Sequence, residues 1–230
     1  MLISEIYRSR QGEGLLTGTP SVFVRTSGCN LRCSFCDTPF ASWEPEGTQL
    51  SVRQIVQQIR TSAEDARHVV VTGGEPMLPR EISELCQAIQ DSEFHVTIET
   101  AGTIHRELPC DLMSVSPKFS NSDPQEGRAG KWRKKHQSTR YRPEIVGQLI
   151  QQYEYQLKFV VDSPADLDEI LSYLAKLKPV DPTRVMLMPQ GVDLAELDKR
   201  AQWLEPLCNV NGFTFCPRKH IQWYGNKRGT

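Results

Sequence analysis

The chain has 230 residues, which fits one domain that is long enough to bury a sizeable core. Its formal net charge of −1 provides no overall field to recruit nucleic acid or a membrane surface. No apolar run approaches the roughly 18 residues of a membrane helix, and residues 1–5 do not begin a secretory leader. We therefore expect a cytoplasmic protein with neither a nucleic-acid nor a membrane partner.

Predicted strands and helices alternate along most of the chain. Runs rich in Val, Ile and aromatic residues predict strands at 20–26, 68–72, 94–99, 111–115, 155–161, 184–188 and 210–215. Apolar residues on one face predict helices at 51–62, 79–91, 143–152, 163–174 and 193–204. Ser51 and Gln54 have the spacing of a capping box, and Ser163 followed by Pro164 is typical of a helix start.

This alternation predicts an α/β fold with a parallel sheet covered by helices. About six strand–helix units are too few for a closed eight-fold barrel. We therefore expect an incomplete (β/α)6-like partial TIM barrel, formed by a single domain of residues 1–230 with an N-terminal segment at 1–19.

One segment, at about 121–142, breaks the alternation. It has little apolar periodicity and contains seven basic residues: Arg128, Lys131, Arg133, Lys134, Lys135, Arg140 and Arg142. Such a patch could contact RNA. Because Trp132 is the only aromatic side chain available there for stacking before Tyr141, the pattern favours a solvated or partly mobile loop inserted over the site.

The most informative motif is a C-x₃-C-x₂-C loop directly after the first predicted strand, formed by Cys29, Cys33 and Cys36. Three thiolates can bind three irons of a [4Fe–4S] cluster, and the fourth iron then has no nearby protein ligand. Zinc would also need a fourth ligand, and chance grouping is the remaining alternative. The odd total of seven cysteines favours metal ligation over a disulfide framework. We expect core or structural roles for the other four: Cys86, Cys110, Cys208 and Cys216.

Polar motifs follow several other predicted strands. They are Gly73-Gly74-Glu75, Glu99-Thr100, Ser116-Pro117-Lys118 and Pro189-Gln190. Because the carboxyl ends of parallel strands meet at one edge, these motifs should gather around the cysteine loop. Each motif alone is also compatible with an ordinary turn.

The cysteine loop, with aromatic Phe35 before its third cysteine, resembles the signature of the radical S-adenosylmethionine (SAM) family. Three further stretches bring the resemblance to the 7-carboxy-7-deazaguanine synthase family: Gln11-Gly12-Glu13-Gly14, Cys36-Asp37-Thr38 and Thr72-Gly73-Gly74-Glu75-Pro76. The match is strong through residue 118 and looser beyond it. The same partial barrel is implied by this resemblance.

The resemblance implies roles for individual residues. It assigns SAM binding to Phe35, Cys36, Asp37, Gly74, Glu75, Ser116, Pro117, Lys118 and Gln190. It assigns substrate binding to Arg10, Gln11, Gly12, Glu13, Arg25, Thr72 and His220. It makes Thr38 a ligand of Mg²⁺, whereas the residues alone would allow a turn threonine.

For two of these residues the sequence leaves a second role open. Arg25 is expected to face the side opposite Phe23, where it could bind a substrate carboxylate or form a structural ion pair. His220 could equally be an exposed histidine near the chain end.

The implied reaction is a Mg²⁺-dependent ring contraction of 6-carboxy-5,6,7,8-tetrahydropterin to 7-carboxy-7-deazaguanine with loss of ammonia. SAM serves as the cofactor that supplies the radical. The resemblance also implies a flavodoxin- or ferredoxin-type reductant and a homodimer. The alternatives are an enzyme that installs a glycyl radical on a partner protein, and a non-catalytic electron carrier.

Overall fold

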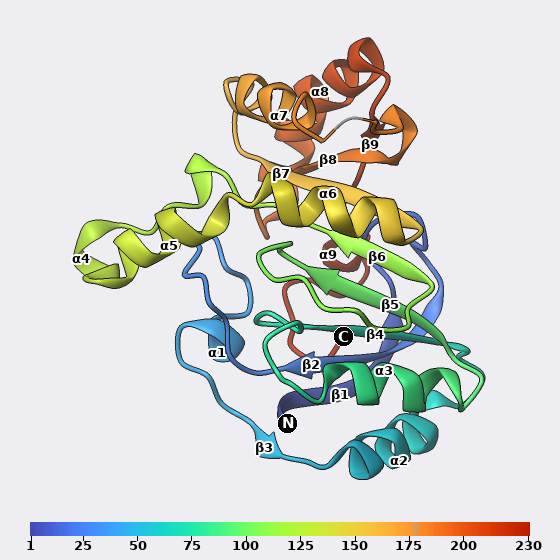
Figure 1. Cartoon of the computed structure of the whole chain (residues 1–230). Coiled ribbons are helices and arrows are strands. Elements are labelled where there is room, and N and C mark those ends of the chain that lie inside the picture. Colours follow the sequence, from blue (N-terminus) through green and yellow to red (C-terminus); the bar gives the residue numbers. More distant parts are fainter. Residues whose placement is uncertain (178) are drawn as a thin grey trace.

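The computed structural model describes residues 1–177 and 179–230, with the side chains of residues 128 and 129 left aside. Its strands are β1 Leu2–Arg10, β2 Pro20–Thr26, β3 Thr48–Gln49, β4 His68–Gly73, β5 His95–Thr100, β6 Leu112–Val115, β7 Tyr155–Val161, β8 Val185–Pro189 and β9 Thr214–Phe215. They form a nine-stranded sheet in the order β3-β1-β2-β4-β5-β6-β7-β8-β9 (Figure 1). The sheet is parallel from β2 onward, and β1 pairs antiparallel with both β2 and β3.

The helices mostly cover one face of this sheet (Figure 1). They are α1 Pro39–Ser42, α2 Val52–Ala63, α3 Ile82–Gln90, α4 Glu126–Ala129, α5 Trp132–Arg140, α6 Pro143–Gln152, α7 Asp166–Leu174, α8 Leu194–Asn211 and α9 Lys219–Tyr224. Within the described ranges, none of them combines the length and apolar character that crossing a membrane requires. The open parallel sheet with helices confirms the predicted partial barrel, because β3 and β9 end the sheet without pairing to each other.

Side-chain alternation gives the sheet two different faces. The face toward the helices is apolar and fully buried, as at Val22 and Val24 of β2 or Leu157 and Phe159 of β7. The opposite, inward face carries polar and charged residues at the intervening positions: Ser21, Arg25, Thr72, Thr97, Glu99, Ser114, Gln156 and Lys158. The hydrophobic core therefore lies between sheet and helices, and the inward face is left for chemistry.

Several predicted boundaries were correct and others were wrong. The Ser51–Gln54 capping box is confirmed, because the Gln54 amide donates to Ser51 Oγ and the Ser51 amide to Gln54 Oε1. The predicted cap at Ser163 is wrong: α7 begins later, and the carboxylate of Asp166 instead accepts from the Ser163 amide.

The two ends of the sheet were poorly predicted. The strand at 210–215 is mostly wrong, because α8 continues to Asn211 and stops at Gly212, whose φ of 68° is left-handed. Only β9 remains of it. Sequence patterns also missed β1, whose mixed polar and apolar residues reflect one face on α2 and one face on the barrel interior.

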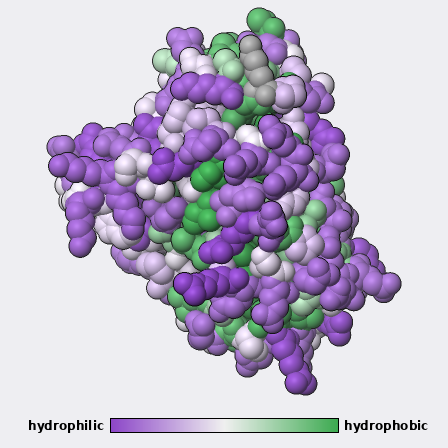
Figure 2. Space-filling model, in the orientation of Figure 1, coloured by the Kyte–Doolittle hydropathy of each residue, from purple (hydrophilic) through white to green (hydrophobic). Residues whose placement is uncertain are grey.

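The segment 121–142 is not the irregular loop that its composition predicted. It contains α4 and α5, which stand away from the sheet as an arm (Figure 1). The same region of the surface is largely hydrophilic (Figure 2). Helix α5 lacks apolar periodicity because one buried side chain, His136, provides its main anchor to the body.

The end of β4 predicts a strict size limit at Gly74. A Cβ added to Gly74 would lie 2.1 Å from the Gly28 carbonyl oxygen and 2.5 Å from that of Ala41. Gly74→Ala should therefore lower the free energy of unfolding by about 2 kcal/mol or more, since backbone atoms would have to move. Gly147→Ala is the matched control, because its Cβ meets nothing within 4 Å in α6 and should raise stability by up to about 1 kcal/mol. Urea unfolding of both variants checks this, and equal effects would contradict it.

Candidate active site

The cysteine loop connects β2 to α1 at the carboxyl end of the barrel strands. All three thiols are partly buried. Burial raises the pKa of Cys29 and of Cys33 to about 12, so the free thiols stay protonated at neutral pH. The third thiol, Cys36, lies 3.1 Å from Ser42 Oγ and 3.8 Å from Thr38 Oγ1. Metal binding would deprotonate all three.

Arg32 fixes the shape of this loop. Its guanidinium donates to the carbonyl oxygens of Cys29 at 2.8 Å and Leu31 at 2.7 Å. The same group stacks on the ring of Trp132 in α5, 3.9 Å from its centroid. The arm therefore holds the loop through the residue directly before Cys33.

A second set of contacts from the arm passes through His136. The Arg32 amide donates to His136 Nδ1 at 3.1 Å, and His136 Nε2 lies 3.0 Å from Ser122 Oγ. Burial lowers the pKa of His136 to about 4, which keeps Nδ1 unprotonated as an acceptor. On the far side of Cys33, the Ser34 amide donates to the Ser122 carbonyl oxygen at 3.0 Å.

The donor set fits an iron–sulfur cluster. A [4Fe–4S] cluster binds each cysteine through a different iron, so its thiolates surround a cube rather than meet at one point. Within the part of the chain that the structure describes, no three His, Cys, Asp or Glu side chains converge on a single metal position. Three thiols on one partly exposed loop, spaced along it by two and three residues, are compatible with the larger group.

The Gly73–Gly74–Glu75 turn packs against this loop. The amides of Gly74 and Glu75 donate to the carbonyl oxygens of Thr26 and Gly28, which explains why glycine is needed there. The Glu75 carboxylate is fully buried, and burial raises its pKa.

Glu75 already has three protein donors. It accepts from Thr100 Oγ1 at 2.7 Å, the Ala101 amide at 3.0 Å and the Met77 amide at 3.1 Å. The carboxylate therefore holds the loop after β5. Three donors leave about one of the carboxylate's four acceptor sites unused.

Ser116 and Lys118 lie at the end of β6, as expected. Lys118 Nζ donates to the Ser116 carbonyl oxygen at 2.7 Å and to Ser116 Oγ at 2.6 Å. Burial lowers the pKa of Lys118, whereas the nearby Cys33 thiol acts in the opposite direction. Lys118 makes no ion pair among the described residues, so its charge is available to an anionic group beside the cysteines.

A chain of ion pairs crosses the inward face. Lys158 Nζ lies 3.1 Å from Glu13 Oε2 and 3.0 Å from Glu99 Oε1. Arg218 donates from Nε to Glu13 at 3.1 Å and from its terminal nitrogen to Asp37 at 2.5 Å. Burial alone would raise the pKa of Glu13, but Lys158 and Arg218 together hold it well below its usual range. Glu13 is thus a partly buried, ionised carboxylate.

The C-terminal segment closes over the N-terminal one. The Lys219 amide donates to the Gly12 carbonyl oxygen at 2.8 Å, and the Gly14 amide donates to the Cys216 thiol at 3.2 Å. A Cβ on Gly12 would lie 2.4–2.7 Å from His220, whose Nδ1 is 3.8 Å from Glu13. His220 therefore lies beside Glu13, and Gly12 is small because the imidazole packs on it.

Arg25 forms the ion pair that its sequence position left open. Its Nε donates to Glu5 Oε1 at 2.7 Å and its terminal nitrogen to the Tyr7 hydroxyl at 3.0 Å. The prediction that Arg25 faces the side opposite Phe23 is wrong, because residues two apart share a face of a strand. Arg25 and Phe23 both contact Tyr7, whose ring stacks on that of Phe23 with centroids 5.2 Å apart.

Other predicted residues take varied positions. Thr38 occupies the position before α1 without a side-chain capping bond, and Thr72 is buried on the inward face. Gln11 is buried and donates to Ser21 Oγ at 2.9 Å. Gln190 is partly buried after β8, and its backbone N–H donates to the Val161 carbonyl oxygen.

Three further predicted site residues differ in their exposure to solvent. Phe35 is partly buried in the cysteine loop, and Pro117 is buried between Ser116 and Lys118. Arg10 differs, because it is exposed and lines a surface groove with Trp223 and Tyr224. The structure does not bring Arg10 together with the ion-pair chain.

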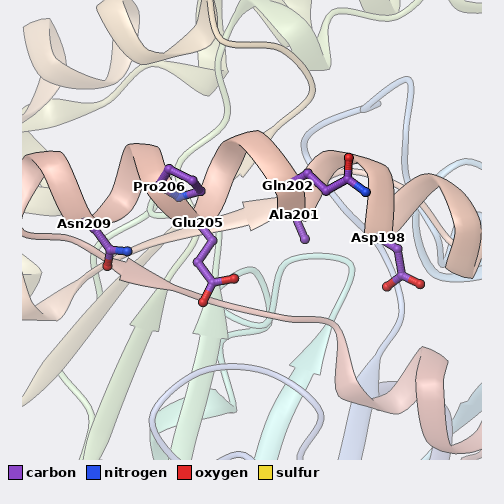
Figure 3. A pocket seen from close by; sticks show the side chains of 6 residues that line it. All are labelled: Asp198, Ala201, Gln202, Glu205, Pro206 and Asn209. Carbon is purple, nitrogen blue, oxygen red and sulfur yellow. The ribbon is translucent and has the colours of Figure 1, made fainter.

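A separate cavity of about 370 Å³ follows α8 and contains none of the predicted site residues (Figure 3). Its lining comes from that helix alone: Asp198, Ala201, Gln202, Glu205, Pro206 and Asn209.

Sequence reasoning missed Lys158 and Arg218. A signal existed for Lys158, since a lysine inside the buried strand β7 requires a partner. Arg218 had no such signal in the sequence, because its partners Glu13 and Asp37 lie near the opposite end of the chain.

Residues 23–142, about half of the chain, match the model of the radical SAM superfamily. The chain is 47% identical over its whole length to the 7-carboxy-7-deazaguanine synthase of Rhodopirellula baltica and covers 89% of that protein. It is 45% identical to the synthase of Halobacterium salinarum, over 95% of this chain and 88% of that one. The fold matches the crystal structure of QueE from Escherichia coli with a TM-score of 0.73 at 23% identity, covering 95% and 94% of the two chains.

A three-cysteine loop at the mouth of a partial barrel, with these matches, defines a radical SAM enzyme. Within that superfamily the chain belongs to the 7-carboxy-7-deazaguanine synthase family.

The ion-pair chain predicts a large cost for removing Lys158. Lys158→Met would leave Glu13 and Glu99 without their shared cation and should destabilise the fold by about 2–3 kcal/mol at pH 7. The cost should shrink toward pH 4, because unpaired carboxylates then take up protons. Arg8→Met, which removes an exposed pair with Asp65, should change stability little. The measurement is the free energy of unfolding by denaturant at pH 7 and pH 4. Equal losses of stability from the two substitutions would contradict the prediction.

Proposed function

We propose that the chain converts 6-carboxy-5,6,7,8-tetrahydropterin to 7-carboxy-7-deazaguanine with loss of ammonia. The observation that carries the proposal is the ionised Glu13, held beside the cysteine loop by Lys158 and Arg218. The identity with two synthases over nearly the whole chain supports the same reaction.

Cys29, Cys33 and Cys36 would hold a [4Fe–4S] cluster with one iron open to SAM. When bound, this pair supplies a 5′-deoxyadenosyl radical that removes a hydrogen from the substrate. Lys118 and Ser116 would bind the carboxylate and ribose of SAM, since their cation and hydroxyl already lie together near Cys33.

The other SAM contacts are proposed along the same rim. The backbone of Gly74 and Glu75 would accept from the SAM ammonium group. Phe35, Asp37, Pro117 and Gln190 would surround the adenine and ribose.

Glu13 and Gln11 would recognise the pyrimidine edge of the substrate. An ionised carboxylate accepts from two neighbouring N–H groups, which a 2-aminopyrimidinone ring offers. Gly12 and His220 would limit the ring from one side, and Thr72 would contact it from β4. Arg10 would need a rearrangement to take part.

Arg25 would bind the substrate carboxylate in competition with Glu5. Arg25→Met should then weaken pterin binding with little change in SAM binding, measured by calorimetry on the reconstituted protein. A loss of folding stability with unchanged pterin affinity would leave Arg25 only its ion pair.

We also propose a physiological reductant of the flavodoxin or ferredoxin type, a homodimeric state and a cytoplasmic location. These follow from the family resemblance and from composition.

The proposed activity is tested by mass spectrometry of products from anaerobically reconstituted enzyme supplied with SAM, reductant and the carboxypterin. Cys33→Ala should lose both the cluster absorbance and product formation, because one of three iron ligands is gone. Cys110→Ala, a substitution outside the loop, should retain both. Turnover by a Cys33→Ala protein that keeps four irons would overturn the assignment.

Thr38 is proposed to ligate Mg²⁺ beside the substrate. Its hydroxyl is not used to cap α1, and Mg²⁺ can complete its octahedron with waters and substrate oxygens. Thr38→Ala should keep the cluster and SAM binding but lose most of the stimulation by added Mg²⁺. Thr38→Ser should lose less. The measurement is turnover against Mg²⁺ concentration after chelator treatment, and superimposable curves would reduce Thr38 to a turn residue.

A further inference from the structure

The arm formed by α4 and α5 lies in a strongly basic segment of a chain with a formal net charge of −1. Residues 121–142 contain seven basic and two acidic side chains. Part of this charge is used internally, since Arg133 pairs with Glu126 at 3.2 Å and Arg140 with Asp123 at 2.9 Å.

Three lysines of the arm remain without an ionic partner. Lys131, Lys134 and Lys135 are exposed, and among the residues that the structure describes none of them forms an ion pair. The Lys135 ammonium lies over the Trp132 ring, 4.4 Å from the ring centroid. The arm thus presents positive charge to solvent, on a part of the surface that is largely hydrophilic (Figure 2).

This charge stands next to the cysteine loop. The arm contacts the loop at Arg32, through His136 and Trp132 of α5, and Ser122, a few residues before α4, accepts from the Ser34 amide on the other side of Cys33. Ser34 is exposed and Cys33 is partly exposed, so this edge of the loop can be approached from solvent. A cluster held by Cys33 would lie beside this edge.

We propose that the arm is the docking surface for an acidic electron-carrier protein. The inference rests on the proposed function, because it needs a cluster on the cysteine loop. One electron leaves the carrier and enters the cluster, which is reduced by one electron while the carrier is oxidised by one. Complementary charge would steer the carrier to the loop and raise its association rate.

A nucleic acid is the competing occupant of a basic surface. Proteins that bind single strands combine positive charge with aromatic rings that are free to stack on bases. Trp132 is not free in this way, because the Arg32 guanidinium and the Lys135 ammonium both lie over its ring, 3.9 and 4.4 Å from the centroid. The surface therefore offers charge without a stacking platform, which suits an acidic protein better.

The experiment uses reconstituted holoenzyme mixed in a stopped-flow instrument with pre-reduced acidic flavodoxin. The double variant Lys131→Glu/Lys134→Glu should slow cluster reduction by about tenfold at low salt, and the difference should fade near 1 M salt as screening shortens to about 3 Å. The matched control is Arg53→Glu/Lys199→Glu, which makes the same charge change on exposed positions of α2 and α8 and should leave the rate unchanged.

Reduction by dithionite separates docking from damage to the cluster. It should proceed at the same rate in wild type and in both variants. Slower reduction of the arm variant by dithionite as well, or an unchanged rate with flavodoxin, would overturn the proposal. So would RNA binding that the arm substitutions abolish while flavodoxin-driven reduction stays intact. A wild-type protein without cluster absorbance would instead refute the proposed function.

Discussion

The ionised carboxylate of Glu13 is the feature on which the site depends. A charge on the inward face of the barrel is costly unless cations stand beside it, and here two do. Lys158 comes from the middle of β7, and Arg218 from the segment before α9. Neither would be buried without the carboxylate, so the three groups account for one another.

Arg218 extends this constraint to the cysteine loop. The same guanidinium contacts Glu13, Asp37 and the Gly191 carbonyl oxygen, so it joins the N-terminal segment, the loop and the turn after β8. A substrate group bound by Glu13 and a cluster bound by Cys36 would then be fixed relative to each other by one side chain. Relative position matters because radical transfer requires reacting atoms in near contact.

Much of the fold could be predicted from sequence because its strands are continuous apolar runs with helices between them. The cysteine loop could be found because three cysteines lie within eight residues. The arm could not, because α5 is held by Arg32, His136 and Trp132 rather than by an apolar stripe. The strand β1 was missed for a different reason: an irregular register between Ile3 and Glu5 places Ile3 and Ile6, three residues apart, both against the core, and this breaks the period of two that marks a strand.

The candidate site residues differ in how many of their hydrogen bonds the protein itself already uses. A motif shows which groups stand at the mouth of the barrel but not which of their hydrogen bonds the protein itself uses. Glu75 accepts three bonds from its own chain, and Arg25 makes with Glu5 the ion pair that its sequence position had left open. Lys118 has no ionic partner within the described chain, so it is the cation best placed to meet an anionic ligand beside the cysteines. Burial explains why Glu75 and Arg25 have internal partners: a charge that folding desolvates needs a partner within the protein, unless a ligand provides one.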